Sequence, residues 1–124
     1  MAKYLSDTIL DNALSYLKNN VTQMAVCSQQ PMDLAGAVTT YKLALKTGLL
    51  PSSFTGPVDG DTNGRKLTAN SQSSVAVDTG GTATHVAWCS ASALLFVTTC
   101  TSQILTAGNT LTIPAHKVEM GDIV

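Results

Sequence analysis

The second half of the chain is a series of short segments rich in β-branched, aromatic and apolar residues, separated by turn signals. Asp78-Thr79-Gly80-Gly81 and Ala107-Gly108-Asn109 are two of these signals, and residues 90–93 are expected to close a hairpin. Many short strands at this spacing are typical of a β-sandwich or a small barrel, here with about six to eight strands. The expected strands are residues 65–71, 74–78, 84–90, 94–105, 110–114 and 116–124.

The first twenty residues predict a single amphipathic helix over residues 5–19. Asp7 in the first turn and Lys18 in the last suit the helix dipole, and Asn19-Asn20 is a plausible stop. Apolar residues recur at helical spacing, and we expect their face to be buried on the sheet or on a neighbouring subunit. That face comprises Leu5, Ile9, Ala13, Tyr16 and Leu17. The opposite face, expected to be exposed, comprises Asp11, Asn12, Ser15 and Lys18.

Between these parts, residues 21–28 and 39–48 each predict a strand, and Asp33 is expected to cap a helical turn over residues 34–38. In the second strand, alternation places Tyr41, Leu43 and Leu45 on one face. Residues 48–64 contain two prolines and four glycines, and predict a long loop suited to interaction. The chain is therefore expected to be one domain, residues 1–124, with a helix in 1–20 and a β-rich body in 21–124.

Only 12% of the residues are charged, and the net charge is −1. No stretch concentrates basic residues, which argues against nucleic-acid binding. No window is apolar and long enough to span a membrane, and the opening residues do not form a secretory signal. A neutral surface rich in Ser and Thr is easily desolvated, which favours permanent assembly and a homo-oligomer, a trimer or another ring. An ordinary β domain with a neutral surface is the alternative.

Asp59-Gly60-Asp61-Thr62-Asn63-Gly64 matches the first half of a calcium-binding loop, with candidate ligands Asp59, Asp61 and Asn63. The second half of the pattern fails, because Asn70 occupies the position of the bidentate Glu. Asp, Asn and Gly are also common turn formers. We therefore interpret this string as a turn and assign it no metal.

No other motif predicts a catalytic or cofactor-binding site. Gly80-Gly81-Thr82-Ala83-Thr84 lacks the Lys of a phosphate loop and precedes a strand. His85 and His116 have no partner that the sequence can identify, and Trp88 and Phe96 are expected to pack across the hairpin. The three cysteines are interpreted as buried core residues: Cys27, Cys89 and Cys100. The acids lie at helix ends, in turns or in the polar C-terminal segment: Asp7, Asp11, Asp33, Asp59, Asp61, Asp78, Glu119 and Asp122. We expect a protein that is not an enzyme and holds no cofactor.

Nearly the whole chain resembles a group of small proteins encoded among the virion genes of tailed bacteriophages and prophages. The resemblance begins in KYLSDTILDNALSYLKNN, continues to Cys27-Ser28 and Gln30-Pro31, and extends to the Ile113-Pro114 strand. Further matching strings are Tyr41-Lys42-Leu43-Ala44, Phe54-Thr55-Gly56-Pro57, Asp59-Gly60-Asp61, Gly64-Arg65-Lys66, Gly81-Thr82-Ala83-Thr84-His85-Val86-Ala87, Thr99 to Gln103, Leu105-Thr106 and Gly108-Asn109-Thr110. At His116-Lys117 the chain departs from the acidic or aromatic residues that are frequent in the group.

The resemblance implies a structural component of the virion, assembled in the bacterial cytoplasm. A decoration or cement protein of the capsid, with the major capsid protein or other virion proteins as partners, is the first expectation. A neck, tail or fibre-attachment protein is the second, and a module that binds glycans or a host surface is a further alternative. Many copies on a symmetric lattice would supply affinity through repeated contacts.

Overall fold

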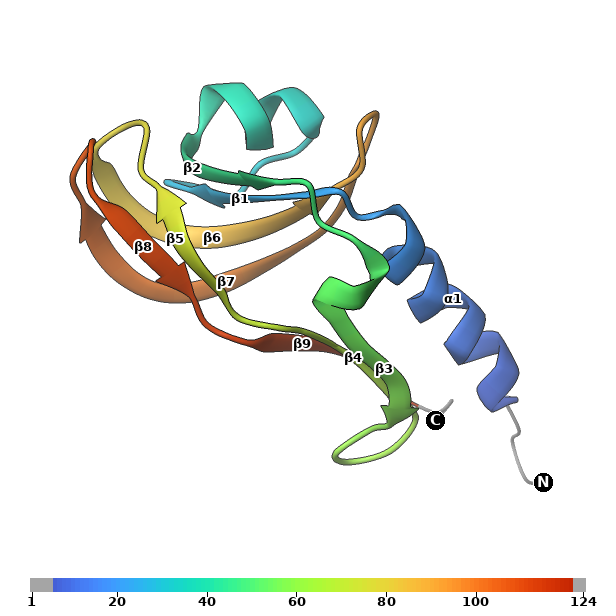
Figure 1. Ribbon diagram of the computed structural model, residues 1–124. Helices are drawn as coiled ribbons and strands as arrows, with labels where there is room; N and C mark the ends of the chain where they lie inside the picture. Colours follow the sequence, from blue (N-terminus) through green and yellow to red (C-terminus); the bar gives the residue numbers. More distant parts are fainter. Residues whose placement is uncertain (1–5, 122–124) are drawn as a thin grey trace.

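The computed structural model describes residues 6–121, which form a mainly β protein behind one N-terminal helix (Figure 1). Helix α1 covers Asp7–Asn20, and two short helical segments follow, a π-helix η1 (Gly36–Thr40) and a 3-10 helix η2 (Pro51–Ser53). The described strands are β1 (Gln23–Cys27), β2 (Lys42–Thr47), β3 (Phe54–Asp59), β4 (Arg65–Ala69), β5 (Gln72–Ala76), β6 (Gly81–Cys89), β7 (Leu94–Leu105), β8 (Thr110–Ile113) and β9 (His116–Met120). The mainly β fold is confirmed, and each of the six segments expected in the second half overlaps a strand, although β5 and β6 begin two and three residues earlier than expected.

The strands form three antiparallel sheets. Four strands pair in the order β2-β1-β6-β7, three in the order β3-β4-β9, and β5 pairs with β8. A single bridge between Ala44 of β2 and Val77, just after β5, connects the first sheet to the third. In Figure 1 the four-stranded sheet curves behind β5 and β8, and the three-stranded sheet extends toward α1. This order leaves β7 and β8 at the two ends of a curved series of strands.

Helix α1 begins at Asp7 and ends at Asn20, within two residues of the start and end that the sequence predicts. The Ser6 hydroxyl accepts a hydrogen bond from the Thr8 amide at 3.2 Å, which caps the first turn. At the other end, the Val21 amide donates to the Leu17 carbonyl at 2.9 Å. Leu5, the first residue of the expected apolar face, lies outside the described residues.

The expected buried face of α1 is wrong by one residue. Leu10 and Leu14 are buried and Leu17 packs on the same core, whereas Ile9 and Tyr16 are 57% and 59% exposed. Both sets of residues have helical spacing, because moving every position by one residue keeps the spacing and rotates the face by about 100°. Polar contacts of the face expected to be exposed decide which apolar face is buried. Lys18 Nζ donates to the Gly56 carbonyl at 2.9 Å, and Asp11 pairs with Arg65 at 2.7 Å, so these side chains turn toward β3 and β4.

Strand β1 is buried on both faces. Met24 and Val26 point into the main core, together with Trp88 and Leu14. On the other face lies a second core of small residues, covered by the segment that contains η1. This second core comprises Ala25, Cys27, Ala37, Ala87 and Cys89. The small side chains let the helical segment approach the sheet closely. Asp33 accepts a hydrogen bond from the Gly36 amide at 2.7 Å, which confirms its capping role.

Two expectations about the middle of the chain are wrong. Residues 48–64 are not one long loop, because they contain η2 and the strand β3. Phe54 is buried opposite Ala69, and Pro57 is tolerated because β3 is an edge strand that needs no amide on its outer side. The alternation in β2 is also interrupted by a bulge opposite Val26 and Cys27. Leu43 consequently joins the main core, while Leu45 packs against the second core.

Candidate interaction surface

The segment from Asp59 to Gly64 forms a closed turn between β3 and β4. The Gly60 amide donates to the Gly64 carbonyl at 2.9 Å. The Asp61 carboxylate pairs with Lys66 at 2.6 Å and also with Lys117, and its backbone amide donates to Glu119. The Asp61 carboxylate is therefore held by cationic side chains of β4 and β9. Within residues 6–121, no group of three His, Cys, Asp or Glu side chains converges to hold a metal ion.

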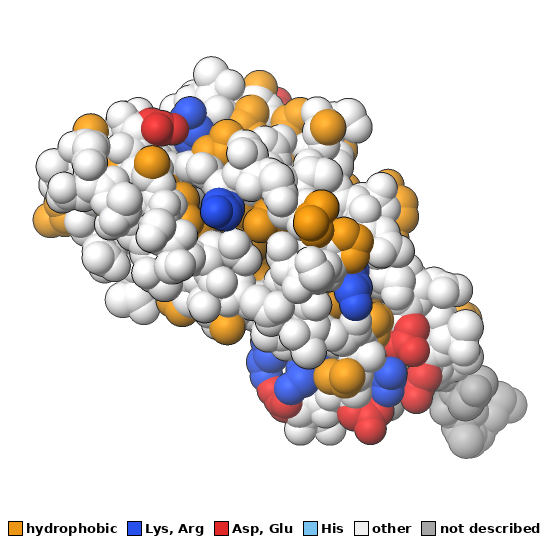
Figure 2. All heavy atoms as spheres, in the orientation of Figure 1, with side chains coloured by type: hydrophobic (Ala, Val, Ile, Leu, Met, Phe, Trp, Pro, Cys, Tyr) orange, Lys and Arg blue, Asp and Glu red, His pale blue; other side chains and the backbone are white. Residues whose placement is uncertain are grey.

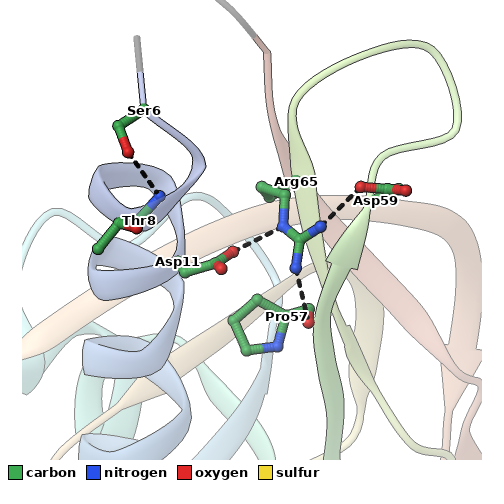
Figure 3. A network of polar contacts seen from close by, with 6 residues as sticks. All are labelled: Ser6, Thr8, Asp11, Pro57, Asp59 and Arg65. Carbon is green, nitrogen blue, oxygen red and sulfur yellow. Dashed lines mark hydrogen bonds and ion pairs between the residues drawn. The ribbon is translucent and has the colours of Figure 1, made fainter.

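Arg65 joins α1 to the β3–β4 hairpin (Figure 3). Its Nε donates to Asp11 at 2.7 Å, its Nη1 to Asp59 at 2.6 Å, and its Nη2 to the Pro57 carbonyl at 3.4 Å. The hydrogen bond to Asp11, followed by that to Asp59, raises the pKa of Arg65 above its usual value. The guanidinium thus stays charged and bridges three elements, which is a structural role.

Neither histidine is paired with a serine. Thr84 donates its hydroxyl hydrogen to the Ser28 carbonyl at 3.0 Å, and the same hydroxyl lies 2.8 Å from His85 Nδ1. Ser90, at the end of β6, instead accepts hydrogen bonds from the Ser92 and Ala93 amides and so closes the turn to β7. The structure therefore does not bring His85 and Ser90 together.

Trp88 organises an aromatic cluster in the main core. It is fully buried, and its ring lies 4.8 Å from Phe96, as the hairpin prediction required, and 5.2 Å from Phe54. The sequence did not predict that His116 of β9 would complete the cluster: Trp88 Nε1 donates to His116 Nε2 at 2.7 Å. His116 Nδ1 lies 3.0 Å from the Pro114 carbonyl, which suits a neutral ring protonated at Nδ1. Being buried, Trp88 offers no platform for a sugar ring.

The cysteine prediction is correct for two residues and wrong for the third. Cys27 and Cys89 are buried in the second core, and burial raises the pKa of each thiol to about 11. Cys100 is exposed in β7, where it lies in a Thr-rich run, whereas Cys27 and Cys89 each follow apolar residues. The difference arises because the part of β7 beyond Thr98 extends past the side chains that cover its first half.

A groove lies between β7 and residues 109–114, which comprise β8 and the residue on either side of it. Its larger part has a volume of about 500 Å³ and its smaller part about 290 Å³. Cys100, Thr101 and residues 103–106 line the larger part on the side of β7, and residues 109–114 line it on the side of β8. The core residues Val26, Val77, Ala83 and Val86 complete the lining. Among the described residues that line the larger part, Cys100 is the one titratable side chain. The groove therefore offers apolar and neutral polar contacts.

Charge is distributed very unevenly over the molecule. From residue 67 to residue 116 the sequence contains a single charged residue, Asp78. Figure 2 shows acidic and basic side chains gathered at the end that carries β3 and the nearby end of α1, while the end that carries β5 and β8 is mostly neutral. This stretch, uncharged apart from Asp78, supplies β5, β6, β7 and β8, and hence both walls of the groove. The low charge of residues 67–116 is the sequence signal by which the surface around the groove could have been found.

Comparison with known proteins gives no relative. No protein family, curated protein or solved structure matches this chain. Among residues 6–121, no helix has both the length and the apolar character needed to cross a membrane.

Proposed function

We propose that this chain is a non-enzymatic structural protein of a bacteriophage virion, and that it decorates or cements the capsid through protein–protein contacts. The observation that carries the proposal is the uncharged β6–β8 region, with a groove and an exposed strand at its edge. Such a surface loses little hydration free energy when a protein covers it, since it holds no ions to desolvate. The resemblance to virion proteins, described above, is the reason for naming a virion as the assembly to which the chain belongs.

The fold suits such a role as an incompletely closed small barrel, and we propose this architecture over a two-layer sandwich. The strands β7, β6, β1 and β2 are continuous by pairing, and the bridge between Ala44 and Val77 leads on to β5 and β8. The series then stops, with the groove between its two ends. A closed barrel has no free edges, whereas this one keeps two for contact with partners.

The copy number of the chain in purified particles tests the proposal. Quantitative mass spectrometry against the major capsid protein should give a ratio corresponding to hundreds of copies per particle. A dozen copies or fewer would instead place the chain in the neck or tail. Complete absence from purified particles would overturn the virion role itself.

A further inference from the structure

We propose that the free edge of β7 is a self-association surface, at which two copies of this chain pair their β7 strands antiparallel about a two-fold axis. The inference deepens the proposed function, because it assigns a surface to the self-assembly expected of a virion protein. It rests on four features of β7: its unpaired edge, its exposure, its composition and its neutrality.

The outer edge of β7 has no strand partner among the described residues. β7 pairs along its inner edge with β6, from Gly81 opposite Leu105 to Cys89 opposite Leu94. β8 follows after a turn that includes Gly108, yet it pairs with β5 and leaves the groove between itself and β7. Backbone amides and carbonyls on that side of β7 are thus available to a strand supplied by another molecule.

The second half of β7 is uncovered on both faces. Residues 99–104 are all exposed, although successive side chains in a strand point to opposite sides. Ile104 is 80% exposed, an unusual position for a large apolar side chain in a strand. An added strand would cover the edge, and the body that carries it would cover these side chains.

β7 also lacks the devices that protect edge strands. Its twelve residues include no charge, no proline and no glycine. Two other strands at sheet ends carry such devices: β3 contains Gly56-Pro57 and ends at Asp59, and β2 carries Lys42 and Lys46. The strands β5 and β8 are also uncharged, but they have only five and four residues against the twelve of β7, and a short edge is itself protective. A long, uncharged edge without such features pairs readily with another strand.

A second copy of this chain fits the edge because antiparallel pairing about a two-fold axis places the strand against itself. Any charge near the axis would face its own copy and repel it, and β7 has none. Thr99 and Thr101 would instead meet neutral hydroxyl, thiol or amide side chains, and Thr pairs across strands are favourable. Six residues span only about 20 Å of edge, so we expect a dimer of modest affinity.

Analytical ultracentrifugation of the full chain up to millimolar concentration tests the surface. Thr101→Lys places two like charges near the axis and should weaken dimerisation about tenfold or more. Asn12→Lys adds the same charge on the exposed side of α1 and should leave the dimer unchanged; the melting temperature of each variant verifies folding. A wild-type protein that stays monomeric, or a dimer that Thr101→Lys leaves intact, would overturn the inference.

Disulfide trapping tests the geometry independently. Because Cys27 and Cys89 are buried, mild oxidation should link two copies through Cys100. In a Cys100→Ser background, single cysteines at positions 99, 101, 102 and 103 should cross-link most strongly at one position and less on either side. Cross-linking through Asn12→Cys instead would assign self-association to α1 and refute the β7 surface. A β7 dimer from a chain missing from particles would refute only the virion role.

Discussion

The end of the molecule where α1 packs on β3 and β4 and the end formed by β6, β7 and β8 are stabilised in different ways. At the first, charged side chains pair with one another, and Arg65 alone contacts Asp11 and Asp59. At the second, the sequence supplies no charged residue from 79 to 116, and stability comes from apolar packing on the main core, which also contains Trp88 and Leu14. The first end satisfies its polar groups internally, whereas the second leaves a neutral strand edge for another molecule.

Removing Trp88 should have the largest effect, because this fully buried side chain joins the uncharged strands β6 and β7 to β3 and β9 of the charged end. Trp88→Ala deletes a fully buried ring that contacts Phe54, Phe96 and His116, and should lower the free energy of unfolding by about 3–5 kcal/mol. Urea denaturation of the variant and the wild type measures this loss in the free energy of unfolding. Trp88→Phe, which keeps a ring but loses the hydrogen bond to His116, should cost less; equal losses would contradict the packing explanation.

The charged end should also depend on one apolar face of α1. Leu14→Ala should cost about 2–5 kcal/mol, because Leu14 is fully buried. Ile9→Ala, on the exposed face, should stay within about 0.5 kcal/mol of the wild type. The two variants remove similar side chains from one helix. If both were equally destabilising in urea, the face described for α1 would be incorrect.

The thiols of the second core should make stability fall at high pH. The folded-state pKa values of Cys27 and Cys89 are about 11 against 9.0 for a free thiol, so the unfolded chain releases protons first as the pH rises. The contribution of the two protonated thiols to the free energy of unfolding is complete below pH 9 and is lost between about pH 9 and 11. Unfolding of a Cys27→Ala/Cys89→Ala variant should show a flatter decline over this range; an identical decline would assign it to other groups.

Loss of the Arg65 network should have a smaller, salt-dependent effect. Arg65→Met leaves Asp11 and Asp59 without their cation and should lower the melting temperature by a few degrees at low ionic strength. High salt should reduce the difference. Lys42→Met breaks a single ion pair of 3.0 Å with a half-exposed Asp78 and should change the melting temperature less. A larger effect from Lys42→Met would reverse the contrast between the two ends.

Calcium should have no effect on stability. Asp59 and Asp61 are paired with Arg65, Lys66 and Lys117, so a cation would have to displace existing partners. The melting temperature should be the same with millimolar calcium and with a chelator, for the wild type and for Asp59→Asn/Asp61→Asn. A rise with calcium in the wild type alone would show that the loop binds the ion.

Local sequence patterns determined the elements of this protein well. The strand expected over residues 94–105 occupies Leu94–Leu105, and the dipole and stop signals placed α1 to within two residues at each end. The pairing of Trp88 with Phe96 followed from hairpin geometry, because residues opposite one another in adjacent strands are fixed by the short turn. These features depend on neighbours in the chain, which a sequence displays directly.

Tertiary packing decided what local patterns leave open. Ile9 and Leu10 are equally suited to a buried face, and the partners of Lys18 and Asp11 on β3 and β4 selected Leu10. Cys89 and Cys100 both lie in strands, yet only Cys89 is covered, because the segment at η1 packs over β1 and β6. Burial depends on elements distant in sequence. The same reason explains why the uncharged composition was visible in the sequence, whereas the free edge of β7 emerged only once the strand order was known.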